Sequence, residues 1–150
     1  MNALTVPEGF VARSVALNDV DIVADLFTAH SLAIAGVEDV SAEQRLNFWQ
    51  SPGFNPVADI QLVFTNGGQL VACVEVWIDM HALIRACVHP NFMGKGLGTY
   101  ITAWGEERCR QAIDMLPADL RLTARVDAYS TDLPAHQLFE DMNWTYDRSF

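Results

Sequence analysis

Basic residues are scarce in this chain, which has nine Lys and Arg against 19 Asp and Glu and a formal net charge of −10 at pH 7. Binding to the phosphate backbone of nucleic acid needs a basic face, and adsorption to anionic membranes needs one as well. The composition therefore predicts neither nucleic acid nor a membrane as a partner. It fits a cationic partner or substrate, or an acidic surface that keeps the protein soluble.

Cysteine is also scarce, with three residues, an odd number, and no Cys-x-x-Cys pair. The sequence therefore predicts neither a disulfide framework nor a metal site of the zinc type, and free thiols in apolar surroundings are typical of the reducing cytosol. No apolar run reaches the roughly 18 residues of a membrane span. Residues 1–8 lack the basic and apolar regions of a signal peptide. We expect a cytoplasmic protein.

Apolar sequence is plentiful, at 51% of the 150 residues, which argues against intrinsic disorder and suffices for one buried core. We find no repeat, low-complexity stretch or linker, and the longest candidate loop is 51–58. The prediction is a single domain over residues 1–150.

Hydrophobic periodicity and capping patterns predict elements in the order β-α-α-β-β-β-α-β-α-β. The predicted strands lie at 10–15, 59–65, 69–78, 83–88, 120–126 and 144–150. The first helix is capped by Asn18, and the second begins with a capping box of Ser41 and Gln44. The other two helices lie at 96–115 and 133–142. The Asn-Gly-Gly turn at 66–68 predicts a hairpin. Helices around a hairpin run imply a mixed sheet in an α/β fold, with a parallel pair and a right-handed crossover around helix 96–115.

The most informative segment, 88–99, connects a strand to the long helix. Gly94, Gly96 and Gly98 alternate in it, so that backbone N–H groups can face one anion at the positive end of the helix dipole. Such a nest binds phosphate or pyrophosphate, and Lys95 adds a cation. The segment fits neither a P-loop, since no Ser or Thr follows Lys95, nor the dinucleotide fingerprint.

This segment resembles the acyl-CoA-binding motif of the GNAT superfamily of acyl-CoA-dependent N-acyltransferases, Arg/Gln-x-x-Gly-x-Gly/Ala after a strand that ends in Val-x-Pro. Gly96 and Gly98 match the motif glycines, and Val88 and Pro90 match the strand end. Met93 stands at the first motif position in place of Arg or Gln. The resemblance covers most of the chain and implies a GNAT-like mixed central sheet flanked by helices.

A second resemblance lies at 132–144, which is similar to the family's late motif Asn-x-x-Ala-x-x-Leu-Tyr-x-x-x-Gly-Phe. Ala135 and Leu138 match, whereas Asp132 replaces Asn and Phe139 replaces Tyr. A phenyl ring cannot donate a proton as the Tyr does. The chain also ends before the strand that completes the family's sheet, so we expect a homodimer or a second GNAT-like domain to cover that edge.

The resemblance implies transfer of an acyl group, with acetyl-CoA as the expected co-substrate, to a primary amine of a small molecule or protein through a tetrahedral intermediate. It implies that the backbone of Ala86, Cys87 and Val88 pairs with the pantetheine arm, and that the Val88 amide polarises the thioester carbonyl. The implied pyrophosphate and cofactor contacts are Met93, Gly94, Lys95, Gly96, Leu97, Gly98, Thr99 and Asp132.

Proton transfer has several candidates. His81, at the start of the fourth strand, lies near where the family often keeps its base, and an imidazole exchanges protons near neutral pH. Glu75 on the preceding strand is a second candidate base, and Asp79 is a weaker third. Tyr129 is the candidate acid in place of Phe139. Each has a simpler interpretation: a turn residue for His81, an outward-facing strand residue for Glu75 and a packing residue for Tyr129.

Three interpretations of function stay open. The first is an N-acyltransferase whose acceptor amine is cationic, in keeping with the acidic composition. The second is a non-catalytic GNAT-like module that binds CoA weakly or serves as the dimerisation half of a tandem protein. The third is a plain α/β module without a cofactor. Residues 26–58, where such folds select the acceptor, carry no motif that names it.

Overall fold

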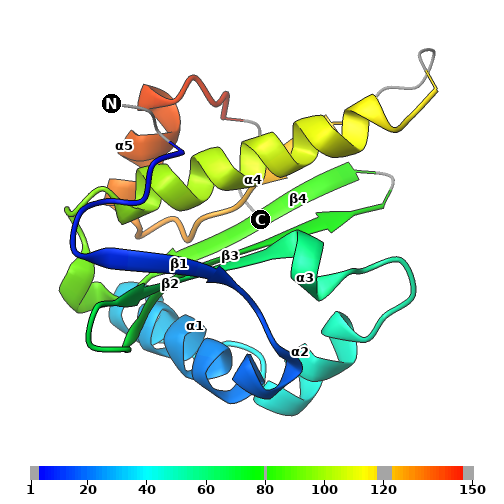
Figure 1. Ribbon diagram of the computed structural model, residues 1–150. Helices are drawn as coiled ribbons and strands as arrows, with labels where there is room; N and C mark the ends of the chain where they lie inside the picture. Colours follow the sequence, from blue (N-terminus) through cyan, green and yellow to red (C-terminus); the bar gives the residue numbers. More distant parts are fainter. Residues whose placement is uncertain (1–3, 80, 118–122, 147–150) are drawn as a thin grey trace.

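A computed structural model describes residues 4–79, 81–117 and 123–146 of the chain and shows a mixed sheet between two layers of helices (Figure 1). The strands are β1 (Phe10–Ser14), β2 (Ile60–Thr65), β3 (Leu70–Ile78), β4 (His81–Val88) and β5 (Thr123–Val126). The helices are α1 (Val20–Ala35), α2 (Ala42–Trp49), α3 (Pro56–Asp59), α4 (Leu97–Asp114) and α5 (Leu133–Asp141), with 3-10 turns at Leu17–Asp19 and Pro90–Phe92.

The five strands lie in the order β1-β2-β3-β4-β5. The first three pairings are antiparallel, and β4 pairs with β5 in parallel. The long helix α4 connects those two parallel strands, as the sequence predicts. The mixed α/β fold is therefore confirmed.

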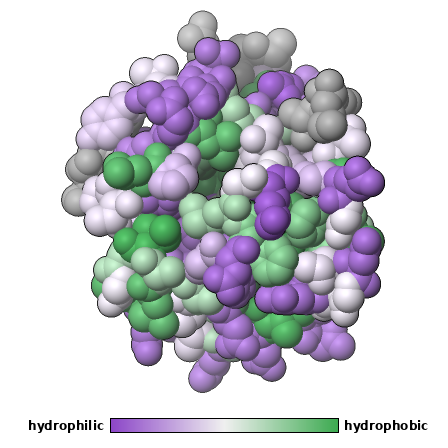
Figure 2. Space-filling model, turned by 90° about the vertical axis from the view of Figure 1, so that its left-hand side faces the viewer, coloured by the Kyte–Doolittle hydropathy of each residue, from purple (hydrophilic) through white to green (hydrophobic). Residues whose placement is uncertain are grey.

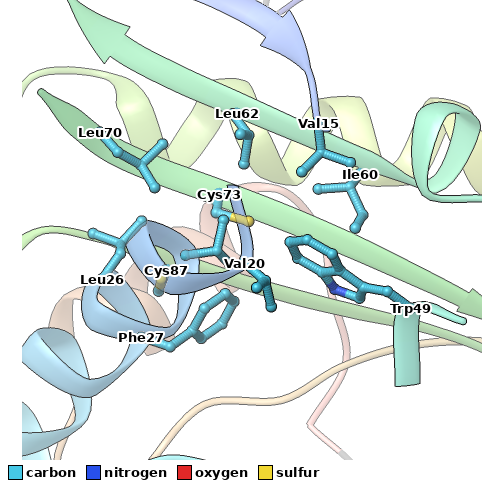
Figure 3. Close-up of a cluster of buried hydrophobic side chains, with 11 residues drawn as sticks. Val15, Val20, Leu26, Phe27, Trp49, Ile60, Leu62, Leu70, Cys73 and Cys87 are labelled. Atoms are coloured by element: carbon cyan, nitrogen blue, oxygen red, sulfur yellow. The ribbon is translucent and has the colours of Figure 1, made fainter. Parts of the chain in front are cut away.

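Both faces of the sheet carry a core. On one face, α1 and α2 cover the cluster of Figure 3, which consists of Val15, Val20, Val23, Leu26, Phe27, Trp49, Ile60, Leu62, Leu70, Cys73 and Cys87. On the other face, α4 covers a second cluster that includes Ile84, Leu97, Tyr100 and Ile101. Every residue of β3 from Leu70 to Val76 is buried, because helices cover both faces of this central strand.

The first helix begins differently from the prediction. Asn18 lies inside the 3-10 turn, and Asp19 occupies the N-cap position of α1. The carboxylate of Asp19 accepts hydrogen bonds from the Ala16 N–H and the Arg13 guanidinium, both at 2.8 Å. The prediction that Asn18 caps the first helix is therefore wrong. Asp19 takes the N-cap position instead, and its hydrogen bonds join the end of β1 to the start of α1.

The remaining boundaries follow the predictions closely. The capping box of α2 is confirmed, since the Gln44 N–H donates to Ser41 Oγ at 3.2 Å and the Ser41 N–H donates to Gln44 Oε1 at 3.1 Å. The predicted loop 51–58 contains the start of α3, with Pro56 in its first turn. Of the predicted last strand, Trp144–Tyr146 lie outside the sheet and 147–150 lie outside the described residues, as do 120–122 of the strand before it.

The three cysteines, Cys73, Cys87 and Cys109, are free and buried. Within the described ranges, none of the helices has both the length and the apolar character needed to cross a membrane.

Candidate functional site

The candidate site starts from the hydrogen-bonding pattern of β4. The His89 N–H donates to the Val71 carbonyl at 2.8 Å, and the Asp79 N–H donates to the His81 carbonyl at 2.9 Å. In an antiparallel pair, residues that bond to the partner strand alternate with residues that face away from it. With the register that sets Cys73 opposite Cys87, Cys87 therefore bonds to β3, whereas Ala86 and Val88 direct their backbone groups to the other edge.

That other edge of β4 is open over its last residues. Pairing with β5 ends at Ile84 opposite Val126, and in the part of the chain that is described no backbone partner faces the N–H groups of Ala86 and Val88. We call the backbone N–H groups of Ala86 and Val88 the free edge. A ligand with amide groups can bond there as an added strand would. Cys87, the third residue implied to pair with pantetheine, has its backbone groups turned to β3 instead.

A tight turn follows the free edge and leads into α4. Gly94 and Gly96 have φ angles of 77° and 85°, in the left-handed region that glycine adopts without strain. Gly96 is the N-cap of α4 and supplies no side-chain bond, so the N–H groups of the first turn of this 18-residue helix lack a side-chain cap. Lys95 is exposed and forms no ion pair with any described residue. The turn therefore presents N–H donors and one cation to an anion.

Figure 2 faces the end of the molecule where Figure 1 places this turn. Its upper half contains a hollow with apolar surface inside and hydrophilic surface beside it. A concave site of mixed polarity is suited to a ligand that has both an apolar arm and charged groups.

Gly98 has a different structural role from the two glycines before it. It lies in the first turn of α4, where an added Cβ would come within 3.0 Å of Leu138 Cδ2 on α5. Gly98 therefore lets α5 approach α4. The neighbouring Leu97 is buried in the core, at 1% exposure, so its side chain belongs to the packing and only its backbone faces the turn.

His30 of α1 is a site residue that the sequence predictions missed. Its Nδ1 lies 3.1 Å from the Val88 carbonyl oxygen, and its Nε2 lies 3.4 Å from Asp132 Oδ2. The imidazole therefore connects the free edge of β4 to the start of α5. A signal was present, because His30 follows Phe27 by three residues on the helix face that packs on the sheet.

Asp132 forms the N-cap of α5, where its Oδ1 accepts a hydrogen bond from the Ala135 N–H at 3.2 Å. Burial by itself would raise the pKa of this carboxyl group. The hydrogen bonds from His30 and from the Ala135 N–H outweigh burial and hold the pKa below its ordinary value. Asp132 thus caps α5, as Asn also can, and adds a negative charge opposite His30.

Tyr129 lies three residues beyond β5 and is 37% exposed. Its carbonyl accepts from the Asp132 N–H at 2.9 Å and lies 3.0 Å from His136 Nε2. Its phenol hydroxyl has no hydrogen-bond partner in the described part of the chain. The backbone of this candidate acid is held in place, and its hydroxyl is available.

Glu75 is fully buried, at 0% exposure, so its interpretation as an outward-facing strand residue is wrong. Its two carboxylate oxygens accept from Arg45 Nη1 at 2.7 Å and from Trp49 Nε1. Arg45 also binds Asp39 at 3.0 Å and stacks over the Phe27 ring at 4.1 Å. With both oxygens engaged by α2, Glu75 anchors that helix, and this geometry does not favour it as a base.

His81 is exposed and is the first residue of β4, opposite Thr123. It lies five residues from Ala86, or about 17 Å along an extended strand. Asp79, the third candidate base, is also exposed and bonds its backbone to His81. The structure therefore gathers the candidate cofactor contacts at one end of β4 and leaves His81 and Asp79 at the other end, whereas Glu75 lies opposite Arg85 but is engaged by α2.

An acidic pocket of about 430 Å³ lies between α1 and the segment that leads into α2. Its carboxylates come from Asp21, Asp25, Glu38 and Asp39. Asp39 is bound to Arg45, and its other oxygen lies 3.8 Å from Arg85 Nη2 on β4. The pocket therefore concentrates negative charge on α1 and on the segment before α2. Part of this surface falls within residues 26–58, the region expected to select the acceptor.

Comparison with known proteins identifies the family of this chain. Residues 25–144 match the model of the Acetyltransferase (GNAT) family. No curated protein sequence matches the chain.

Solved structures are similar to the fold over nearly its whole length. A GCN5-related N-acetyltransferase from Sphaerobacter thermophilus is 30% identical with a TM-score of 0.82, and the match covers 92% of this chain but 44% of that one. The chain thus spans less than half the length of that relative. The yncA protein of Salmonella typhimurium, solved with its cofactor acetyl-CoA, is 15% identical with a TM-score of 0.69 over 92% of this chain and 80% of that one. An acetyltransferase of the GNAT family from Streptococcus pneumoniae is 13% identical with a TM-score of 0.59 over 89% and 83%.

Proposed function

The chain belongs to the GNAT acetyltransferase family, and from this premise we propose that it transfers an acetyl group from acetyl-CoA to a primary amine. The observation that carries the proposal is the continuity of two features: the free edge at Ala86 and Val88 leads directly into the glycine turn and the uncapped start of α4. An amide-containing arm and a pyrophosphate need these two kinds of backbone donor in this order.

The residues present fit acetyl-CoA. Gly94 and Gly96 have positive φ angles, and a Cβ at Gly96 would lie 3.5 Å from Pro7 Cγ. We propose that the N–H groups of the turn and of the first turn of α4 bind the pyrophosphate, with Lys95 as the nearby cation. These local donors offset a net charge of −10 that would repel a polyanion.

For the transfer itself, acetyl-CoA supplies the thioester whose carbonyl carbon the amine nitrogen attacks. The Val88 N–H is the proposed donor to the oxygen that becomes negative, and the Ala86 N–H, about 7 Å away along the strand, is left for an amide of the pantetheine arm. The attack forms the carbon–nitrogen bond, and collapse of the tetrahedral intermediate restores the carbonyl double bond and breaks the carbon–sulfur bond. The proton lost by the amine goes to a base, and the departing thiolate takes up a proton, so the products are an N-acetylated amine and CoA.

We propose Tyr129 as the proton donor to the thiolate, since its hydroxyl is not engaged by the described residues and its backbone is doubly bonded. His81 remains the proposed base and needs water to relay the proton over its distance along β4. Phe139, half-buried on α5, occupies the motif position of the usual Tyr and cannot replace it.

The proposed acceptor is a cationic amine, either a small molecule or a protein side chain. The support is the acidic pocket with Asp21, Asp25, Glu38 and Asp39, together with the acidic composition. A cationic acceptor gains from this charge in its approach, and its attacking nitrogen must lose a proton before it reacts.

The proposal is tested by thermal unfolding and calorimetry with acetyl-CoA, followed by CoA thiol release with a panel of mono-, di- and polyamines. Ligand at 100 times its Kd stabilises the fold by about 2.7 kcal/mol. We expect Gly96→Glu to abolish that stabilisation. Gly53→Glu is the matched control, because Gly53 also has a positive φ, of 86°, but lies in the loop between α2 and α3 with open space around it.

The outcomes separate the two functions that remain. Binding together with thiol release on an amine supports the transferase. Binding without thiol release on any amine supports the alternative, a non-catalytic GNAT-like module, which Phe139 at the motif position favours. A wild-type chain that binds no acyl-CoA, or a Gly96→Glu variant that binds it normally, overturns the proposal.

A further inference from the structure

His30 is nearly buried and lies between two groups that only accept hydrogen bonds. Its side chain is 12% exposed, with the Val88 carbonyl at Nδ1 and the Asp132 carboxylate at Nε2, at 3.1 and 3.4 Å. A neutral imidazole carries one N–H and one lone pair, so it satisfies only one of these acceptors. The imidazolium has two N–H groups and satisfies both.

The groups around His30 leave the Asp132 carboxylate as its charged partner. Asp132 is the N-cap that precedes α5, and the hydrogen bond from His30 helps to keep its pKa low. Cys87 on β4 stays a neutral thiol, because burial raises its pKa well above the ordinary value. His136, one turn into α5, lies with its ring against the Tyr129 carbonyl. His30 thus links the end of β4 to the N-cap of α5.

The position of α5 depends on a few such contacts. None of its residues is fully buried, and its start is held by the His30–Asp132 pair and by Thr131, whose hydroxyl donates to the Ile34 carbonyl at 2.7 Å. Loss of the imidazolium would remove a direct connection between the free edge and this helix. A helix with so little buried surface can move when such a bond breaks.

We propose that His30 is a positioning residue for the cofactor: as an imidazolium it fixes the spacing between the Val88 end of the free edge and the start of α5, the two walls of the acetyl-CoA site. The inference rests on the proposed function and extends it to a residue on α1. Deprotonation of His30 frees the Asp132 end or the Val88 end, and acetyl-CoA then binds a less ordered site.

The test is calorimetric titration of acetyl-CoA into wild type, His30→Gln and His136→Gln at pH 6 and pH 8.5. A charge-assisted hydrogen bond corresponds to about a tenfold change in affinity. We expect wild type to bind about tenfold more weakly at pH 8.5 than at pH 6. His30→Gln should bind weakly at both pH values, since both N–H groups of its amide are on one nitrogen and cannot serve acceptors that lie at opposite ring nitrogens of His30. His136→Gln, the matched control on α5, should keep the wild-type difference.

The ionisation of the ligand is the same for all three proteins, so the difference between variants isolates His30. A second readout is kinetic, because a positioning residue for the cofactor raises the KM for acetyl-CoA more than it lowers kcat.

The failures are distinct. If wild type binds no acetyl-CoA, the proposed function itself fails and the inference falls with it. If wild type binds and His30→Gln keeps both its affinity and its pH dependence, the positioning role alone is overturned. If His30→Gln does not fold, NMR of the wild-type ring nitrogens decides: an imidazole with a single N–H at pH 6 in the bound state overturns the proposal.

Discussion

The helices α2 and α5 are attached to the sheet in different ways. From α2, Arg45 and Trp49 are each 1% exposed and converge on the buried Glu75 of β3. From α5, no side chain is fully buried, and the attachment depends on Asp132 at its first turn. Both regions use a buried carboxylate, but one carboxylate lies in the middle of a core and the other lies at the open edge of the sheet.

This difference indicates that α1 and α2 are held firmly on the sheet, whereas α5 is held loosely. The Glu75 region holds α1 and α2 as one rigid layer, because a buried ion pair loses several kcal/mol when one partner is removed. The α5 region can open at much lower free energy, as ligand-binding elements commonly do. In the proposed site, acetyl-CoA would thus have the loosely attached α5 on one side and the fixed sheet on the other.

The largest expected effect comes from breaking the rigid region. Glu75→Ala leaves the Arg45 guanidinium buried without its partner, and we expect a loss of about 3–5 kcal/mol in the free energy of unfolding. Denaturant titration followed by circular dichroism measures it. The variant should keep its affinity for acetyl-CoA at temperatures where it stays folded, because Glu75 lies outside the free edge.

The double variant Arg45→Met with Glu75→Leu is the control for this prediction. It removes both charges and fills the volume with apolar groups, so most of the stability should return. A loss below about 1 kcal/mol for Glu75→Ala would contradict the role of Glu75 as the anchor of α2. Normal stability with abolished thiol release would instead restore Glu75 as a candidate base.

Two glycines of α4 allow the firmly held sheet and the loosely held α5 to be compared by substitutions with smaller expected effects. A Cβ at Gly105 would lie 2.8 Å from Ile84 Cγ2 on β4, whereas a Cβ at Gly98 would lie 3.0 Å from the end of the Leu138 side chain on α5. Gly105→Ala must displace a fully buried strand residue, and we expect it to destabilise the fold by about 1–3 kcal/mol.

Gly98→Ala meets the flexible end of a half-buried side chain on a helix that can shift. Alanine also favours the helix by about 1 kcal/mol over glycine, so the net change should be close to zero in thermal unfolding. Equal destabilisation by Gly98→Ala and Gly105→Ala would contradict the view that α5 is the more loosely held region.

The sequence predicts the order of helices and strands along the chain well because these elements carry local signals. The capping box of Ser41 and Gln44 and the turn after Thr65 specify their neighbourhoods through bonds between close residues. The glycine turn at 94–96 is read in the same way, since positive φ angles call for glycine wherever they occur. These features depend on a few consecutive residues.

The parts of the site that escaped prediction are made by contacts between distant residues. His30 reaches Val88 across 58 positions, and Glu75 reaches Arg45 across 30. A strand pattern cannot tell whether a carboxylate faces solvent or a buried guanidinium from another helix. Likewise, the separation of Cys87 from the free edge follows from the bonding pattern between β3 and β4, which hydrophobic periodicity does not contain.

The smallest expected effect concerns acid stability at the α5 edge. The pKa of Asp132 is lowered in the folded chain from an ordinary value of 3.8, so the folded state binds the proton less tightly than the unfolded state. Its contribution to stability is complete above pH 3.8 and is lost as pH falls through the lower folded value. Asp132→Asn keeps the N-cap but has no proton to take up, and we expect a loss of about 1 kcal/mol at pH 6 that shrinks toward pH 3.

Asp19 supplies the matched variant on the rigid side, because hydrogen bonds from Arg13 and from the Ala16 N–H lower its pKa as well. Asp19→Asn should show the same sign in denaturant titrations between pH 6 and pH 3. The two carboxylates differ in what they hold: Asp19 joins β1 to α1, whereas Asp132 joins α5 to His30. Only Asp132→Asn should therefore change the affinity for acetyl-CoA. If both variants reduce stability and both leave the affinity for acetyl-CoA unchanged, Asp132 has only a structural role. The proposed difference in ligand binding between the α5 region and the firmly held region would then be contradicted.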